Sequence, residues 1–342
     1  MLKNKFKIRN KIITKKSKTF VISEIGINHE GSFEKCIKMI QLSKKAGADA
    51  IKLQTIDPDL SYAKNTKSYK EFLKTNFENE QLFKLIKLTK KIGLIFISTP
   101  GSFEEVDKLK KFKSDAIKIS SGQMTNYPLI SYAAKKNLPL IISTGMAYQK
   151  EIKEALNSTG KNKNLALLKC TSLYPAPDQD INLNSIETLK KKFKCIVGFS
   201  DHTQDHISCL AAVTMGAKII EKHFTLNSKL KGKDHHISLE PSAFKLMVEK
   251  IRRVEKMLGT NEIGPVKSEK KNRKSFHRYI VAKKIIKKGE KFNKHNISIK
   301  RLKNPTSNNL EPKFYSHLLR KVSNKTIHKN NAVKKNEIKK KN

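Results

Sequence analysis

Polar residues follow short apolar runs along this sequence, and their types suit the binding of an anion. Lys52 and Lys118 lie inside the apolar stretches AIKLQT and AIKIS, where a long cation is costly to bury unless an anion meets it. Hydroxyl side chains stand at comparable positions, at Thr99, Ser121, Ser143 and Ser200. Together these groups predict a cradle for a phosphate or a carboxylate. The alternative for either lysine alone is a structural ion pair with a buried glutamate.

Two histidines close the last two apolar runs. His202 lies in FSDHT and His223 in EKHFT. A single histidine at such a place is typical of a hydrogen-bonded structural residue. Two on neighbouring strands, with Glu24 across from them, predict a divalent-metal site that keeps positions open for substrate. The spacing does not distinguish manganese, zinc and iron.

The elements that must position these residues form a regular alternation. Apolar runs rich in Ile, Val, Leu and Phe, as in buried parallel strands, occupy 19–25, 50–54, 94–98, 116–119, 140–143, 165–170, 195–199 and 218–223. Amphipathic, helical patterns lie between them and after the last, as at 34–46, 80–92, 204–215 and 242–258. Strand followed by helix, repeated in this way, predicts a (β/α)8 TIM barrel over about residues 18–260. A doubly wound sheet is the alternative, but no GxGxxG turn supports it.

In such a barrel, function belongs to the carboxyl ends of the strands. Polar residues end all the predicted strands: Glu24, Lys52, Gln54, Ser98, Thr99, Lys118, Ser121, Ser143, Thr144, Lys169, Thr171, Ser200, His202, Glu221 and His223. A polar strand end means little alone. Their convergence on one mouth predicts a site.

The character of the chain changes after Gly259. We assign 1–260 to the barrel and 261–274, which has Gly, Pro and charges without periodicity, to a linker. Short β-like pieces at 279–282, 297–299 and near 331–333 predict a compact β-rich module over 275–338. A module this small gains little stability alone. Residues 339–342 form a charged tail.

The composition narrows the class of protein. The formal net charge of +42 comes from 72 Lys and Arg against 30 Asp and Glu, but only seven of the basic residues are Arg. Nucleic-acid readers favour the bidentate guanidinium, so lysine spread along the whole chain argues against nucleic-acid binding. Four cysteines without CxxC spacing predict reduced thiols, and no run reaches the ~18 apolar residues of a membrane span. We expect a cytoplasmic protein that does not bind membranes.

A collinear series of motifs identifies a family. SEIGINHEGSFEKCIKMIQLSKKAGADAIKLQT (23–55) resembles the N-terminal barrel motif of the N-acetylneuraminate (sialic acid) synthase family, which includes legionaminate and pseudaminate synthases. The same order continues through FISTP (96–100), IKISSG (117–122), TNYPLI (125–130), ISTGM (142–146), CTSLYP (170–175), GFSDHT (198–203), EKHFTL (221–226) and GKDHHISLEP (232–241). VAKKIIKKGEKF (281–292) resembles the antifreeze-like (SAF) domain that ends these synthases.

The resemblance implies a reaction and a set of roles. The family condenses phosphoenolpyruvate with an N-acyl-hexosamine, giving a nine-carbon α-keto acid and phosphate. Phosphoenolpyruvate would be held by Lys52, Thr99, Lys118, Ser121, Ser143 and Ser200. A metal, usually Mn2+ with Mg2+ or Co2+ possible, would be bound by His202 and His223. The sugar would meet Glu24, Gln123, Tyr174, Asp234 and, from the partner chain of a domain-swapped homodimer, Arg301. The catalytic residues would be Glu24, Lys118, His202 and His223.

Two departures from the family pattern lie on the sugar side. Gln123 stands where an acidic residue is common, and Arg301 lies in IKRLKNP where IKRPG is usual. They leave the sugar open among the legionaminate, neuraminate and pseudaminate types. Rival interpretations are a non-catalytic or spore-coat-type polysaccharide protein on the same scaffold, and a 3-deoxy-sugar-acid synthase, against which the SAF-like segment argues.

Overall fold

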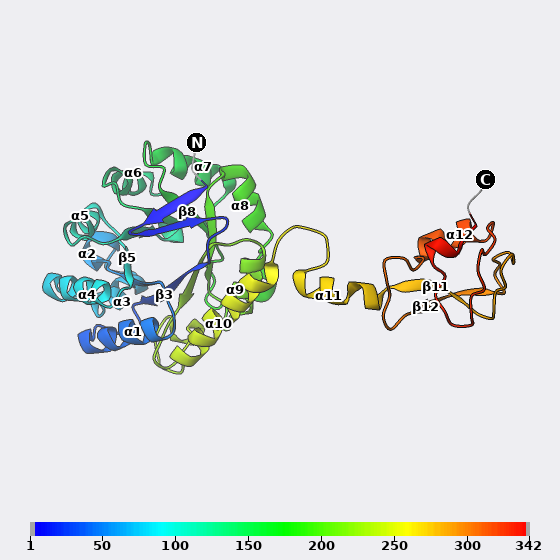
Figure 1. The fold of residues 1–342 in the computed structure, drawn as a ribbon. Helices are drawn as coiled ribbons and strands as arrows, with labels where there is room; N and C mark the ends of the chain where they lie inside the picture. Colours follow the sequence, from blue (N-terminus) through cyan, green and yellow to red (C-terminus); the bar gives the residue numbers. More distant parts are fainter. Residues whose placement is uncertain (1–3, 340–342) are drawn as a thin grey trace. The chain divides into compact units, whose positions relative to one another are not determined.

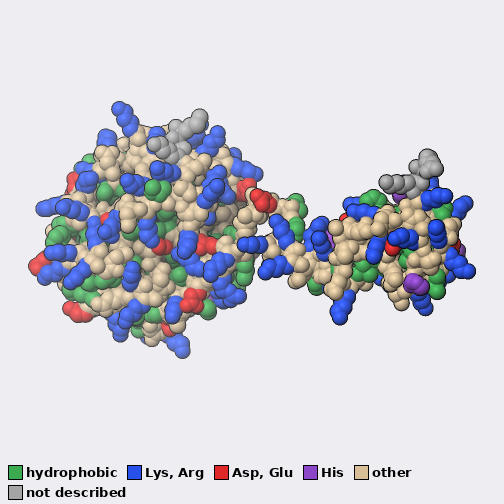
Figure 2. Space-filling view, viewed as in Figure 1, with side chains coloured by type: hydrophobic (Ala, Val, Ile, Leu, Met, Phe, Trp, Pro, Cys, Tyr) green, Lys and Arg blue, Asp and Glu red, His purple; other side chains and the backbone are tan. Residues whose placement is uncertain are grey.

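The computed structural model describes residues 4–339 and divides into two compact units, one ending at Gly259 and the other beginning at Thr260. We describe each unit by itself (Figure 1). Of the predicted charged tail, residues 340–342 lie outside the described part. Figure 2 shows Lys and Arg side chains scattered over the visible surface among polar and apolar ones, without a single basic stripe. No helix within residues 4–339 has both the length and the apolar character needed to cross a bilayer.

The first unit is a closed, wholly parallel barrel, as predicted. Its strands are β3 (Phe20–Gly26), β4 (Ala50–Gln54), β5 (Ile95–Thr99), β6 (Ala116–Ile119), β7 (Leu140–Ser143), β8 (Leu165–Cys170), β9 (Ile196–Asp201) and β10 (Ile219–His223). Each pairs with the next in sequence, and β10 pairs with β3 to close the ring. The doubly wound alternative is therefore excluded.

Helices follow the strands and cover the outside of the barrel (Figure 1). They are α1 (Phe33–Lys45), α4 (Asn79–Lys91), α5 (Phe103–Lys111), α6 (Tyr127–Lys135), α7 (Gln149–Ser158), α8 (Ser185–Phe193), α9 (Ile207–Thr214) and α10 (Pro241–Leu258), with the short α2 (Pro58–Ser61) and α3 (Lys67–Leu73) between β4 and α4. Their starts follow local signals. Ser32 caps α1 by accepting a hydrogen bond from Lys35 N at 3.1 Å, and Ser102 with Glu105 forms a capping box on α5.

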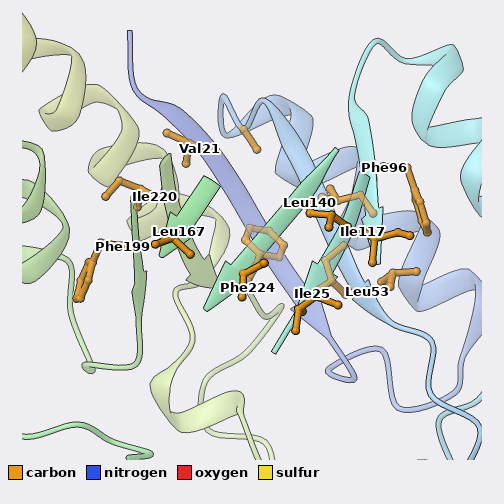
Figure 3. Packing of buried hydrophobic residues seen from close by; sticks show 14 of the residues in the cluster. Val21, Ile25, Leu53, Phe96, Ile117, Leu140, Leu167, Phe199, Ile220 and Phe224 are labelled. Atoms are coloured by element: carbon orange, nitrogen blue, oxygen red, sulfur yellow. The ribbon is translucent and has the colours of Figure 1, made fainter. Parts of the chain in front are cut away.

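Alternation along each strand divides the barrel side chains into two sets. Outward side chains pack against the helices in one large apolar cluster (Figure 3), which includes Val21, Leu53, Phe96, Ile117, Leu140, Leu167, Phe199 and Ile220. Inward side chains near the strand starts form a second apolar cluster, with Phe20, Ile22, Ala50, Ile95, Ile97, Ala116, Ile141, Ala166, Leu168, Ile196 and Ile219. The inward positions that remain, toward the carboxyl ends, are polar.

An antiparallel hairpin closes the amino-terminal end of the barrel, and the sequence analysis did not predict it. Strand β1 (Lys5–Ile8) pairs with β2 (Lys11–Thr14). Phe6, Ile8 and Ile13 join the inner apolar cluster, and Asn164 exchanges hydrogen bonds with the backbone of Lys7 at 2.8 Å. The barrel interior is therefore sealed below by the chain's own amino-terminal segment.

The second unit has its own apolar core. Strands β11 (Arg278–Ala282) and β12 (Ile297–Arg301) form an antiparallel pair, and isolated bridges join later segments to it, such as Val281 with Ala332. The core comprises Ile280, Ala282, Ile286, Phe292, Ile297, Leu310, Leu318, Ile327 and Val333. A short helix, α12 (Tyr315–Leu318), also lies in this unit.

The segment predicted as a linker contains a helix. Residues Lys267–Phe276 form α11, although no residue of this helix is buried. Glu269 caps its start by accepting a hydrogen bond from Val266 N at 2.9 Å. Its exposed, charged residues have good helix propensity but no apolar stripe, and for that reason periodicity did not reveal it.

Crowding inside the barrel makes Gly198 a site for testing this packing. A Cβ there would lie 2.4 Å from the carbonyl oxygen of Ile219 and 2.6 Å from Leu168 Cδ2. Because backbone atoms of β10 cannot move aside, we expect Gly198→Ala to lower the free energy of unfolding by about 1–3 kcal/mol, as overpacking does. Gly122→Ala is the control, since a Cβ there meets nothing within 4 Å. Equal urea midpoints for the two variants would contradict the close approach.

Candidate active site

A buried polar layer lies above the inner apolar cluster, at the carboxyl ends of the strands. It comes from inward positions on β3, β4, β5, β6, β7, β9 and β10, and its members are Glu24, Lys52, Thr99, Lys118, Ser143, Ser200, Glu221 and His223. The convergence of these strand ends is predicted from the sequence, and the closed barrel brings them together.

The carboxylate of Glu221 is the centre of this layer. Its Oε1 lies 3.3 Å from Lys52 Nζ and 3.4 Å from Lys118 Nζ, and it accepts a hydrogen bond from Ser200 Oγ at 3.0 Å. Glu24 provides a second carboxylate, whose Oε1 lies 3.1 Å from Lys52 Nζ. Each predicted cradle lysine therefore has a glutamate partner in the described residues, which is the alternative that sequence analysis left open.

Burial and these ion pairs determine the ionisation of the layer. Burial raises the pKa of Glu24, although Lys52 opposes the effect. Burial acts in the same direction on Glu221, but Lys118 and Lys52 outweigh it and hold the pKa of Glu221 below its usual value. Burial lowers the pKa of Lys118. The two carboxyls are thus separated, since the pKa of Glu221 is held low while that of Glu24 is raised.

Several buried polar atoms of the layer have no hydrogen-bond partner within the described chain. These atoms are Glu24 Oε2, Thr99 Oγ1, Ser143 Oγ, Glu221 Oε2 and His223 Nδ1. An unpaired buried polar group is costly, so such a concentration in one place indicates groups kept for a ligand. The hydroxyls of Thr99 and Ser143 are among those that the sequence analysis selected.

The two candidate metal ligands lie side by side at the mouth. The ring centroids of His202 and His223 are 5.4 Å apart, and Tyr174 stacks on His202 with centroids 4.1 Å apart. His202 Nδ1 lies 2.7 Å from the carbonyl oxygen of Thr171, which assigns a proton to Nδ1 and leaves Nε2 to accept when the ring is neutral. Burial lowers the pKa of His202, but Cys170 and the Thr171 carbonyl outweigh burial and raise it. Burial lowers the pKa of His223 well below its usual value, so that ring is neutral.

Other predicted residues occupy different surroundings. Asp234 is buried, with Oδ2 3.7 Å from His223 Nδ1. Ser121 Oγ accepts a hydrogen bond from Gly145 N at 3.1 Å, and Gln123 Oε1 accepts one from Asn126 Nδ2 at 2.8 Å within its own loop.

Arg301 belongs to the second unit. There its Nε donates to the carbonyl oxygen of Ser275 at 2.7 Å, and its guanidinium lies 3.9 Å from the centre of the Phe276 ring.

Two residues of this site have no role predicted from the sequence. Glu221 was noted only as a polar strand end, although its place two residues before His223 puts both side chains on the inner face of β10. Cys170, at the end of β8, has its Sγ 3.8 Å from His202 Nδ1. Residue type alone does not give these contacts, because they depend on closure of the barrel.

Comparison with known proteins identifies the family. The model of the NeuB family matches residues 39–263. The chain belongs to the NeuB family. The family resemblance seen in the sequence is therefore confirmed. The match covers only the first few residues of the second unit, so the assignment of that unit to the SAF type stays a prediction.

Individual relatives of this NeuB-family chain agree with that assignment. It is 38% identical to the N,N'-diacetyllegionaminic acid synthase of Campylobacter jejuni, over 93% of this chain and 99% of the relative. It is 32% identical to the spore coat polysaccharide biosynthesis protein SpsE of Bacillus subtilis, over 92% and 91%. The solved N-acetylneuraminic acid synthetase of Leptospira borgpetersenii superposes with a TM-score of 0.76 and 32% identity, over 80% of this chain and 96% of that one.

The shared carboxylate leads to a prediction about anion binding by this NeuB-family chain. Glu221→Gln removes the charge that neutralises Lys52 and Lys118 while keeping an oxygen for Ser200. We expect calorimetry to show that this variant binds inorganic phosphate at least about tenfold more tightly than wild type does, because a charge-assisted contact is worth roughly 1.5–3 kcal/mol. Glu187→Gln is the matched control, because it removes one carboxylate from the barrel surface, where Glu187 pairs with Lys191 at 3.0 Å. Equal phosphate affinities in both variants would contradict this account.

Proposed function

We propose that the protein is a nonulosonic (sialic-type) acid synthase that condenses phosphoenolpyruvate with an N-acyl-hexosamine. The observation that carries the proposal is the buried layer of two lysines, two glutamates and unpartnered hydroxyls beside two histidines. The names of the legionaminic acid and sialic acid synthase relatives support the product class.

The residues of the layer suit an anionic substrate that loses phosphate. Lys52 and Lys118 would offset the carboxylate and phosphate charges of phosphoenolpyruvate, and Thr99, Ser121 and Ser143 would donate hydrogen bonds to them. Ser200, whose hydroxyl donates to Glu221, would have to turn its hydrogen from Glu221 to the substrate. The C3 carbon of phosphoenolpyruvate bonds to the aldehyde carbon of the open-chain sugar. Water then adds at C2, and the C2–O bond to phosphate breaks as the keto group forms.

Glu24 is the group to which we assign proton transfer. Burial raises the pKa of this carboxyl, and its Oε2 has no partner within the described chain. It would give its proton to the sugar oxygen as the carbon–carbon bond forms, so that this oxygen becomes a hydroxyl, and would then take a proton from the water that adds at C2. Tyr174, Asp234 and Gln123 would contact the sugar.

The two histidines fit a divalent ion that takes its other ligands from substrate or water. His223 is neutral with Nδ1 unpartnered, and Nε2 of His202 is free to accept. Within residues 4–339 no group of three or more His, Cys, Asp or Glu side chains could hold a metal, so the site would be incomplete without outside ligands. The bound ion, Mn2+ with Mg2+ or Co2+ as alternatives, would supply Lewis acidity toward the sugar aldehyde.

The similarity to SpsE supports a second candidate, a spore-coat-type polysaccharide biosynthesis protein on the same scaffold. One assay separates the two. The purified protein is incubated with phosphoenolpyruvate, Mn2+ and a panel of N-acyl-hexosamines, and mass spectrometry detects a nine-carbon keto acid. We expect product and an equal amount of phosphate with one or more of the sugars. Absence of both products across the panel would favour the second candidate.

The lysine assignment predicts an asymmetric kinetic effect. Lys118→Met should raise the KM for phosphoenolpyruvate about 10–150-fold, the equivalent of one lost charge-assisted contact, and change the KM for the sugar far less. Lys90→Met is the matched control, because Lys90 pairs with Asp115 at 3.1 Å, beyond the opposite end of the strands. Equal increases in both KM values for Lys118→Met would mean that the lysine has a structural role.

Arg301 is proposed to contact the sugar of a partner chain in a domain-swapped homodimer, as the family resemblance implies. Co-expressed chains carrying His223→Ala and Arg301→Ala should then complement each other. In a swapped heterodimer one site receives both defects and the other receives neither, so about half of the heterodimer sites should work. Verified heterodimers without recovered activity would exclude the swap.

A further inference from the structure

A buried ion pair lies in the apolar layer between the barrel and its helices. Lys222 Nζ is 2.7 Å from Asp201 Oδ2, and both side chains are 0% exposed. They occupy outward positions on β10 and β9, where the preceding outward residues, Ile220 and Phe199, belong to the large apolar cluster. These charges are thus on the opposite face of the sheet from Glu221 and Ser200.

A buried ion pair of this kind is expected to add little to the free energy of unfolding. Removing two charges from water costs about as much as their attraction returns, and apolar side chains of similar volume often replace buried pairs without loss. A pair in this layer is therefore better explained by a geometric task than by the stability of the barrel.

The register of the strands shows which residues the ion pair could position. Lys222 and Asp201 are direct partners in the β9–β10 ladder. His223 follows Lys222, and His202 follows Asp201, so each candidate metal ligand is bonded covalently to one member of the pair. The ion pair joins the two strands at the level from which both imidazoles project into the mouth.

The pair also fixes the chain that leaves β9. Asp201 Oδ1 accepts a hydrogen bond from Thr203 N at 3.0 Å, and Oδ2 accepts one from the Thr203 hydroxyl at 3.0 Å. Lys222 Nζ donates to the carbonyl oxygen of Thr203. Cys209 of α9 lies with its Sγ 3.4 Å from Asp201 Oδ2. The backbone on both sides of His202 is therefore held by side chains on the outer face.

We propose that Asp201 and Lys222 are positioning residues that set the spacing of His202 and His223 for a divalent ion. The proposal rests on the metal-dependent synthase proposed above. Neither residue faces the mouth, so they act through the backbone and not by touching substrate. Partners behind metal ligands typically influence affinity because they orient the ligands.

The test measures metal binding without substrates. Full-length protein freed of metal by a chelator is titrated with MnCl2, and free Mn2+ is read by electron paramagnetic resonance. We expect Asp201→Asn, Lys222→Met and the double variant each to weaken Mn2+ binding about 10–100-fold. Because the pair acts as a unit, the double variant should bind Mn2+ no more weakly than whichever single variant has the lower Mn2+ affinity. The double variant also removes both charges at once, which avoids an unpaired buried charge that could unfold the chain.

Ile196→Ala is the control for loss of stability alone. Ile196 is buried at the opposite end of β9, in the inner apolar cluster, so its truncation should lower the melting temperature while the Mn2+ affinity stays within twofold of wild type. Mn2+ affinities within twofold of wild type for the double variant would overturn the positioning role while leaving the metal site intact. If His202→Ala and His223→Ala bind Mn2+ as wild type does, the metal assignment itself is wrong, and the positioning role is overturned with it.

Discussion

Two ammonium groups can lie inside a barrel only if carboxylates lie with them, and this requirement organises the protein's interior. Lys52 and Lys118 come from different strands, yet both reach Glu221 Oε1, at 3.3 and 3.4 Å. This is possible because all three residues occupy inward positions and the closed barrel turns their strands toward one interior. The apolar cluster below and the polar mouth above are arranged around these ion pairs.

The barrel could be predicted from the sequence because buried parallel strands read as continuous apolar runs between amphipathic helices. The polar strand ends could be predicted for the same reason, but the prediction did not separate inward from outward positions. It included Ser98, which follows inward Ile97, lies on the outer face and donates to the carbonyl oxygen of Leu53. The sharing of Glu221 by two lysines could not be predicted, because it depends on contacts between strands far apart in the chain. Strand β1 was missed because its alternating lysines, in KFKI, mask Phe6 and Ile8, whose burial exists only against the assembled barrel.

Strands β9 and β10 carry different chemistry on their two faces. Inward, Ser200, Glu221 and His223 belong to the mouth, while outward, Asp201 and Lys222 join the strands within the helix-covered layer. Nearer the amino-terminal ends of these strands, Gly198 allows β9 and β10 to approach closely, because a side chain there would meet the carbonyl oxygen of Ile219. In the positioning role proposed above, the charge pair behind the histidines sets their geometry. A substitution of that outward pair would then change the mouth without touching it.

The hairpin that seals the amino-terminal end of the barrel has a kinetic consequence. With Phe6, Ile8 and Ile13 filling that end, the described residues leave the mouth at the carboxyl ends of the strands as the way to the buried lysines. A molecule bound at the lysines, as proposed, would pass the histidines and Tyr174 before a second molecule settles above it. Entry would then follow a compulsory order and departure the reverse, so that whatever lies deepest would be the last to leave.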